Sequence, residues 1–202
     1  MATKFWLMKT EPDAFSIRDL QSRPGKKEGW DGVRNYQARN NMRDGMSVGD
    51  KVLFYHSSCD PAGVAGLARI SKAAYEDVSA LDPRSKYYDP KAKPGANPWV
   101  MVEVEFQEEF ARIITLDEMR ETPGLEAMAV LQRGSRLSVQ PVRPGEFEIV
   151  RKLAATAPRT SGPAGTQKSP KSPKPRKANR EKAANIPKPK LKAAKKRARV
   201  SP

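Results

Sequence analysis

The stretch WVMVEVEFQEEF, residues 99–110, alternates apolar and charged side chains. Apolar side chains stand at every second position from Val100 to Phe106, with Glu103 and Glu105 between them. Successive side chains of a β-strand point to opposite faces of its sheet, so this stretch predicts a strand with one apolar face. That face must be buried against other strands or helices.

Weaker patterns extend the prediction in both directions along the chain. Ser16 with Asp19 is typical of a capping box at the start of a helix, and Thr115 is a candidate cap for another helix. We expect strands at 5–9, 51–57, 64–77 and 137–142, helices at 16–23, 35–44, 116–120 and 146–154, and a helical turn within 127–134. Strands outnumber long helices and their order is mixed. This favours an α+β fold with a small curved or closed sheet and helices around it.

Charge divides the chain near residue 154. The whole sequence has 38 Lys and Arg against 23 Asp and Glu. Residues 154–202 hold 15 of the basic residues and one acid, Glu181, whereas residues 1–153 hold 23 basic and 22 acidic residues. All aromatic residues precede the division. We therefore predict a folded domain at 1–153 and a disordered basic tail at 154–202, which has too little apolar surface to offset the entropy of ordering.

The tail is predicted to bind polyanions. Its basic side chains can neutralise phosphates and release counterions, a mode that reads charge rather than base sequence. We expect phosphate contacts from Lys174, Arg176, Lys177, Lys195, Lys196 and Arg197. The alternative is that the tail only keeps the protein soluble.

The sequence contains few residues or motifs that are typical of a catalytic or metal-binding site. His56 and Cys59 are the only histidine and cysteine, whereas zinc sites built of these residues need three or four ligands. No nucleotide-binding or hydrolase motif occurs. We therefore expect a protein that is not an enzyme and that holds no metal or cofactor.

The cellular location of the protein is inferred from the lack of a membrane or secretion signal. No apolar run approaches the roughly 20 residues that span a bilayer, and the first residues lack the apolar core of a secretory signal. We expect no membrane contact, and a place in the cytoplasm or nucleoid of a bacterium or in the nucleus of a eukaryote. A monomer is favoured, although the sequence does not fix the oligomeric state.

Three segments combine aromatic and polar side chains in a way that suits a pocket for a nucleobase. The first, WDGVRNYQARNNMRD at 30–44, offers an indole, amides and arginines. The others are FYHSSCDPAG at 54–63 and the long loop KYYDPKAKPGANPWV at 86–100. Each has a plainer interpretation: Trp30 in the core with arginines on a solvated helix face, His56 as a hydrogen-bonded strand end, and a loop pinned by buried rings.

Together these segments resemble the EVE domain family. The resemblance rests on FWLMKTEP at 5–12, WDGVRNYQARN at 30–40, FYHS at 54–57, GVAGLARI at 63–70, YYDP at 87–90, NPWVMVEVEF at 97–106 and RLSVQP at 136–141. It covers roughly residues 3–153. The tail lies outside it and is similar instead to the Lys/Pro/Ala tails of linker-histone-type proteins.

The resemblance implies a PUA-like curved β-barrel with peripheral helices and a non-catalytic role in binding modified bases, notably 5-methylcytosine. The residues that it implies for a base-binding pocket are Lys9, Thr10, Glu11, Trp30, Val33, Asn35, Ala38, Tyr55, His56, Ser57, Tyr88, Asp89 and Trp99. Arg34 and Arg39 would face backbone phosphate.

The sequence leaves several partners and activities open. DNA is favoured over RNA as the nucleic acid, but an RNA-binding module remains an alternative. A second alternative is a nucleoid or chromatin protein that binds mainly through its tail. A third is an enzyme on modified nucleosides in which Asp89 or His56 is active.

Overall fold

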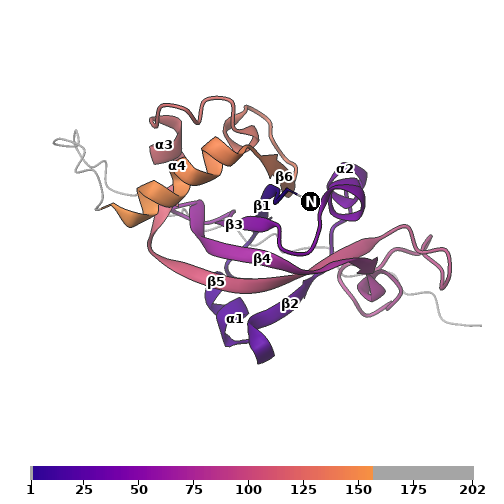
Figure 1. Cartoon of the computed structure of the whole chain (residues 1–202). Helices are drawn as coiled ribbons and strands as arrows, with labels where there is room; N and C mark the ends of the chain where they lie inside the picture. Colours follow the sequence, from indigo (N-terminus) through magenta and orange to yellow (C-terminus); the bar gives the residue numbers. More distant parts are fainter. Residues whose placement is uncertain (1, 157–202) are drawn as a thin grey trace, which may run out of the picture. The chain divides into compact units, whose positions relative to one another are not determined.

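The structure is a computed structural model that describes residues 2–156 (Figure 1). Its strands are β1 (Phe5–Thr10), β2 (Lys27–Trp30), β3 (Lys51–His56), β4 (Gly63–Glu76), β5 (Val100–Thr115) and β6 (Val139–Val142). Its α-helices are α1 (Ile17–Ser22), α2 (Tyr36–Asn40), α3 (Leu116–Arg120) and α4 (Pro144–Ala155). Short 3-10 helices are η1 (Pro24–Lys26), η3 (Val78–Ala80) and η4 (Ala129–Leu131), and η2 (Asn41–Gly45) is one turn of π-helix. The six tail residues predicted to contact phosphate lie outside the described residues.

The strands form one mixed sheet in the order β2-β5-β4-β3-β1-β6. Only β1 and β3 run parallel, and all other neighbours are antiparallel. The pairing of β4 with β5 shifts register at several points, and such bulges increase the bend and twist of long strands. At Gly66 the backbone of β5 comes so close that a Cβ atom would collide with the carbonyl of Glu108. The predicted α+β class and curved sheet are confirmed.

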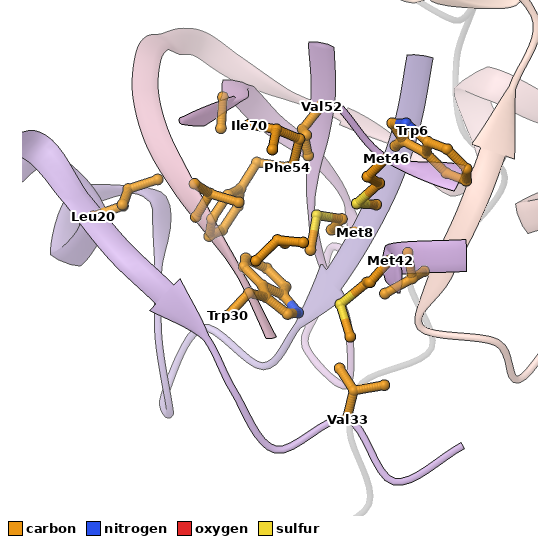
Figure 2. Packing of buried hydrophobic residues seen from close by; sticks show 14 of the residues in the cluster. Trp6, Met8, Leu20, Trp30, Val33, Met42, Met46, Val52, Phe54 and Ile70 are labelled. Atoms are coloured by element: carbon orange, nitrogen blue, oxygen red, sulfur yellow. The ribbon is translucent and has the colours of Figure 1, made fainter. Parts of the chain in front are cut away.

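The two faces of the sheet bury separate apolar clusters. The inner core consists of Trp6, Met8, Ile17, Leu20, Trp30, Val33, Ala38, Met42, Met46, Val52, Phe54, Ala65, Ala68, Ile70, Val102, Val104 and Val139 (Figure 2). The outer core consists of Leu7, Leu53, Tyr55, Val64, Phe110, Ile114, Met119, Leu125, Met128, Val130, Val142, Phe147 and Val150. Figure 1 shows α3 and α4 on the outer side and α1 on the opposite side.

Alternation within each strand decides which core a side chain joins. In β1, Trp6 and Met8 enter the inner core, and Leu7 between them enters the outer one. In β3, Phe54 and Tyr55 separate in the same way. Between bulges, a strand residue therefore reaches the inner side only at every second position. Across the bulges of β4 the alternation shifts, so that Ala65 and Ala68 both join the inner core.

Most elements lie where the sequence predicts them. The capping box of α1 is confirmed, because the Asp19 amide donates to Ser16 Oγ and the Ser16 amide donates to Asp19 Oδ2. Thr115 caps α3 as expected, with its Oγ1 accepting from the Glu118 amide at 3.1 Å. The strand β2 was not predicted, because its four residues KEGW carry a glycine and no alternation. Within residues 2–156, no helix is long and apolar enough to cross a membrane.

The first turn of α1 is held by the only histidine of the chain. The Ile17 amide donates to His56 Nε2 at 3.2 Å, and the imidazole meets the Phe54 ring edge-on at 5.7 Å. This acceptor role requires the neutral imidazole. Burial lowers the pKa of His56 below its ordinary value, although Glu109 and Asp19 act in the opposite direction.

We expect the free energy of unfolding to fall as the pH decreases below about 6.5, the ordinary pKa of histidine. As the pH falls, the unfolded chain binds the proton at about pH 6.5, whereas folded His56 binds it only at a lower pH. The free energy of unfolding is therefore undiminished above about pH 6.5 and falls between the two pKa values, by at most about 1.4 kcal/mol per pH unit. Urea unfolding between pH 5.5 and 7 measures the slope. His56→Gln, whose amide oxygen can still accept from Ile17, should remove it; an equal slope in both proteins would contradict this assignment.

Candidate functional site

A cavity of about 780 Å³ lies at the ends of β1 and β2 and beside the start of β6. We call it the edge cavity, because β2 and β6 are the two edge strands of the sheet. Its lining residues are Lys9, Thr10, Glu11, Ala14, Phe15, Arg23, Glu28, Gly29, Trp30, Asp31, Gly32, Val33, Arg34, Ser57, Lys86, Tyr87, Arg136 and Ser138. The curvature of the sheet thus brings the edge strand β2 and the segment before the other edge strand, β6, around one opening.

Six predicted pocket residues line the edge cavity: Lys9, Thr10, Glu11, Trp30, Val33 and Ser57. Trp30 exposes only 7% of its surface, since its ring packs edge-on against Phe54 at 5.4 Å and against Phe15 at 6.4 Å. Figure 2 shows the indole among the inner-core side chains. Trp30 therefore offers the cavity a small apolar patch and not a free ring face.

The structure does not bring Tyr55 and His56 to the edge cavity. Tyr55 points to the outer core, because alternation along β3 sends it away from Phe54. His56 returns to the inner side, but its Nε2 is occupied by the Ile17 amide. Three consecutive strand residues cannot form one wall, and the plainer interpretation of His56 as a hydrogen-bonded strand end is confirmed.

Asn35 and Ala38 also lie away from the cavity lining. The Asn35 side chain caps α2 by accepting from the Ala38 amide at 3.0 Å. Ala38 is fully buried in the inner core. Both residues build the helix that follows the cavity and do not line it.

Tyr88, Asp89 and Trp99 stabilise the long loop instead of lining the cavity. Trp99 Nε1 donates to Asp89 Oδ2 at 2.7 Å, and Tyr36 stacks on the Trp99 ring with centroids 4.9 Å apart. Trp99 is buried with Ala80 and Ala92, while Tyr88 is exposed. The interpretation of this segment as a loop pinned by buried rings is confirmed.

The two arginines predicted to face phosphate are engaged within the protein. Arg34 lines the edge cavity, yet its NH1 forms an ion pair with Asp77 at 2.7 Å and its Nε donates to the Tyr87 carbonyl. Arg39 donates to the Pro98 carbonyl at 2.8 Å and lies over the Tyr36 ring. Both guanidinium groups are thus half-buried with partners inside the protein, and their contact with phosphate stays a prediction.

The Asp77 carboxylate is the centre of this arrangement. It is fully buried and accepts hydrogen bonds from the Gly32 amide, Arg34 NH1, and the amide and hydroxyl of Ser79. Burial alone would raise the pKa of Asp77, but the hydrogen bonds from Ser79, Arg34 and Gly32 outweigh it and hold the pKa below its ordinary value. Asp77 thereby ties the Gly32 turn of the cavity wall to the end of β4, and its partner Arg34 extends the link to the long loop through the Tyr87 carbonyl.

Several lining residues were not predicted. Phe15 and Tyr87 contribute partly exposed rings, and Arg136, Lys86 and Asp31 contribute charge. Gly32 has a φ of +74°, and a Cβ atom there would lie 2.5 Å from the Tyr87 ring, so glycine permits the close contact. The only signal in the sequence was the aromatic pair 87–88, in which the first tyrosine and not the second meets the cavity.

The charged groups of the edge cavity influence one another. Burial lowers the pKa of the Lys9 ammonium. Partial desolvation raises the pKa of Asp31, the Asp77 and Glu28 carboxylates add to the shift, and Arg34 opposes it. The cavity therefore combines a hydrogen-bond-accepting carboxylate with cationic donors and two aromatic rings, which suits a planar ligand that has polar edges.

Metal binding has no candidate site in the part of the chain that the structure describes. Between residues 2 and 156, no three side chains of His, Cys, Asp or Glu are grouped to hold an ion. The carboxylates of the edge cavity are interleaved with basic side chains.

Replacing Asp77 with Asn should lower the free energy of unfolding by about 3 kcal/mol at pH 7, because Arg34 loses its buried partner. The carboxylate contributes stability above the ordinary Asp pKa of about 3.9 and loses it as the pH falls through the lower folded value. Chemical denaturation from pH 7 to 3 measures both effects.

Asp82→Asn is the matched control, because Asp82 pairs with the exposed Arg84 and the loss should stay below about 1 kcal/mol. An equal decrease in the free energy of unfolding for the two variants would show that the Asp77 carboxylate does not stabilise this region.

Comparison with known proteins places this geometry in a family. The sequence profile described as the EVE domain matches residues 4–153. Thymocyte nuclear protein 1 of Danio rerio is 43% identical over 165 residues, which cover 73% of this chain and 71% of that protein.

Solved structures agree with this match. A Pseudomonas putida protein is 50% identical with a TM-score of 0.71, and the match covers 74% of this chain and 99% of that one. The crystal structure of the human THYN1 protein in complex with 5-methylcytosine-containing DNA is 39% identical with a TM-score of 0.72, covering 77% of this chain and 100% of that one. The PUA-like fold is confirmed, and the chain belongs to the EVE domain family.

Proposed function

We propose that this protein is a non-catalytic reader of modified cytosine in DNA and that the edge cavity receives the base. The observation that carries the proposal is the cavity itself, where rings and polar groups from β2, the segment after β1, the long loop and the segment before β6 surround one opening. It is supported by the similarity to the human THYN1 protein, whose structure was solved with 5-methylcytosine-containing DNA.

The size and chemistry of the edge cavity suit a base that has left its stack. Its volume of about 780 Å³ lies within the range of roughly 300–1,000 Å³ that is usual for small-ligand sites. Extruding a base from a duplex costs a few kcal/mol, and stacking on protein aromatic rings returns about 1–3 kcal/mol. Phe15 and Tyr87 are the rings placed to supply that stacking, and Trp30 supplies an apolar contact.

Polar side chains would fix the edge of the base. The Asp31 carboxylate can accept from the exocyclic amine of cytosine, a group that thymine and uracil lack. Lys9, Thr10, Glu11 and Ser57 line the cavity nearby and offer further donors and acceptors. Apolar contact with Val33 or Trp30 suits a 5-methyl group.

The tail would add affinity without adding selectivity. Residues 1–153 carry almost balanced charge, so the folded part alone would attract a polyanion weakly. The basic residues of 154–202, including Lys174 and Arg176, would raise the local concentration of DNA around the cavity. If the host is a eukaryote, we propose a nuclear location, in keeping with the name of the Danio rerio relative.

The ring of Tyr87 provides the test. In the full-length protein, Tyr87→Ala should reduce binding to an oligonucleotide with one 5-methylcytosine by about tenfold or more, since a stacked ring is worth about 1–3 kcal/mol. Binding to an unmodified oligonucleotide should change little, because the tail contacts only phosphate. Fluorescence anisotropy with DNA and matched RNA oligonucleotides measures both quantities.

Tyr88→Ala is the matched control, because Tyr88 is exposed and does not line the cavity. It should retain the wild-type preference. Equal binding of modified and unmodified oligonucleotides by the wild type would refute the reader. A preference for RNA would favour the RNA-binding alternative, and binding that depends only on the tail would favour the nucleoid or chromatin alternative.

A further inference from the structure

A second depression, of about 380 Å³, lies beside the edge cavity on the side of the loop that precedes β6. Its lining residues are Lys9, Tyr55, Ser57, Ser58, Ala62, Leu116, Arg120, Val130, Gln132, Arg133, Gly134, Ser135 and Arg136. We call it the arginine groove. Four of these side chains are basic and none is acidic, although residues 1–153 as a whole hold 23 basic and 22 acidic residues.

The arginine groove is continuous with the edge cavity. Lys9, Ser57 and Arg136 line both. A linear polymer with one residue bound in the edge cavity can therefore place its next residues in the arginine groove. The groove also offers apolar contacts from Ala62, Leu116 and Val130, which suit the sugars between phosphates.

Two of the arginines are not engaged elsewhere in the described structure. Among residues 2–156, Arg133 and Arg136 are exposed and form neither an ion pair nor a side-chain hydrogen bond. Arg34 differs from them, because Asp77 already neutralises it. Within the described part of the chain, Arg120 pairs only with the exposed Asp117. These guanidinium groups can contact an anion without losing a buried partner.

The loop that carries the two arginines is fixed at several points. The Ser135 amide donates to the Gln132 carbonyl, closing a turn in which Gly134 adopts a φ of +78°. Gln140 Nε2 donates to Ser135 Oγ at 2.9 Å and to the Leu137 carbonyl at 2.6 Å. Lys9 Nζ donates to the Ser135 carbonyl at 3.2 Å. The backbone is thus ordered before any ligand arrives, which reduces the entropy lost on binding.

We propose that the arginine groove binds the phosphodiester backbone of the nucleotides next to the base held in the edge cavity. This proposal rests on the proposed function and adds the path that the nucleotide chain takes across the protein surface. Arg120 and Arg133 would contact phosphates in the groove, and Arg136 and Lys9 would contact the phosphate between groove and cavity. An acidic peptide is the competing occupant, but the shared wall with the edge cavity favours a nucleotide chain.

A neutral-backbone scan tests the strand path with the full-length protein. The probes are single-stranded oligonucleotides with one 5-methylcytosine and one uncharged methylphosphonate, moved one position at a time. The wild type should lose about tenfold in affinity at one or two positions flanking the modified base, as expected for a lost charge-assisted hydrogen bond. The double variant R120Q/R133Q should lose affinity for the charged strand and become insensitive to methylphosphonates in the groove, while the phosphate next to the modified base, which Arg136 and Lys9 would contact, stays sensitive.

The control variant R18Q/R84Q removes the same charge from two largely exposed arginines that line neither the cavity nor the groove. It should keep the positional sensitivity of the wild type. The preference of R120Q/R133Q for 5-methylcytosine over cytosine should persist, because phosphate contacts carry no base information. Circular dichroism confirms that each variant is folded.

The outcomes separate this proposal from the proposed function. If R120Q/R133Q shows the same flanking sensitivity as the wild type, the arginine groove does not bind the strand, even if the 5-methylcytosine preference is intact. If the wild type shows no preference for the modified base, the reader itself fails, whatever the groove does. Binding of a poly-glutamate peptide that R120Q/R133Q abolishes while oligonucleotide binding stays unchanged would overturn the proposal in favour of a protein partner.

Discussion

The structure depends on a sheet that curls without pairing its two ends. In the described residues, β2 and β6 each have one hydrogen-bonded neighbour, and the edge cavity takes side chains from both ends of the strand order. The apolar faces of the strands bury one another in the inner core, with Trp30 from β2 packed against Phe54 from β3. Full closure would pair the free backbone groups of the two edges but would fill the opening. The curl therefore creates the core and the site together.

The period of two along a strand explains both the successes and the failures of the sequence prediction. It identified β5 directly and implied a half-buried sheet around it. The same rule shows why Tyr55 cannot share a wall with its neighbours, since it must join Leu53 in the outer core. The family resemblance gave the segments that surround the cavity, but it did not resolve which side chain of each segment points inward. Tyr87 and Phe15 come from segments with no period, so only the folded arrangement could show that both line the cavity.

The sequence also does not show which charged side chains are already paired within the folded protein. Arg34 lies in the most suggestive motif of the chain, yet a buried carboxylate 43 residues away neutralises it. Arg136 lies in a plain loop and has no such partner in the described structure. Sequence distance hides this difference, because Asp77 and Gly32 become neighbours only when β4 returns beside the cavity. A sequence motif shows only which residues flank an arginine along the chain. Whether that arginine can bind an anion depends on the charges beside it in the folded structure.

A nearly neutral domain can still attract a polyanion if its charge is unevenly distributed. On β5, Glu105 pairs with Arg69 and Lys27 of the neighbouring strands, and Glu109 pairs with Arg18 of α1. The loop before β6 contains no acid between Gln132 and Gln140, so its two arginines remain unneutralised beside Lys9. Local potential follows the nearest charges, because more distant ones are screened beyond about 8–10 Å at ordinary salt. The net charge of the domain thus understates the attraction at the one face where cavity and groove meet.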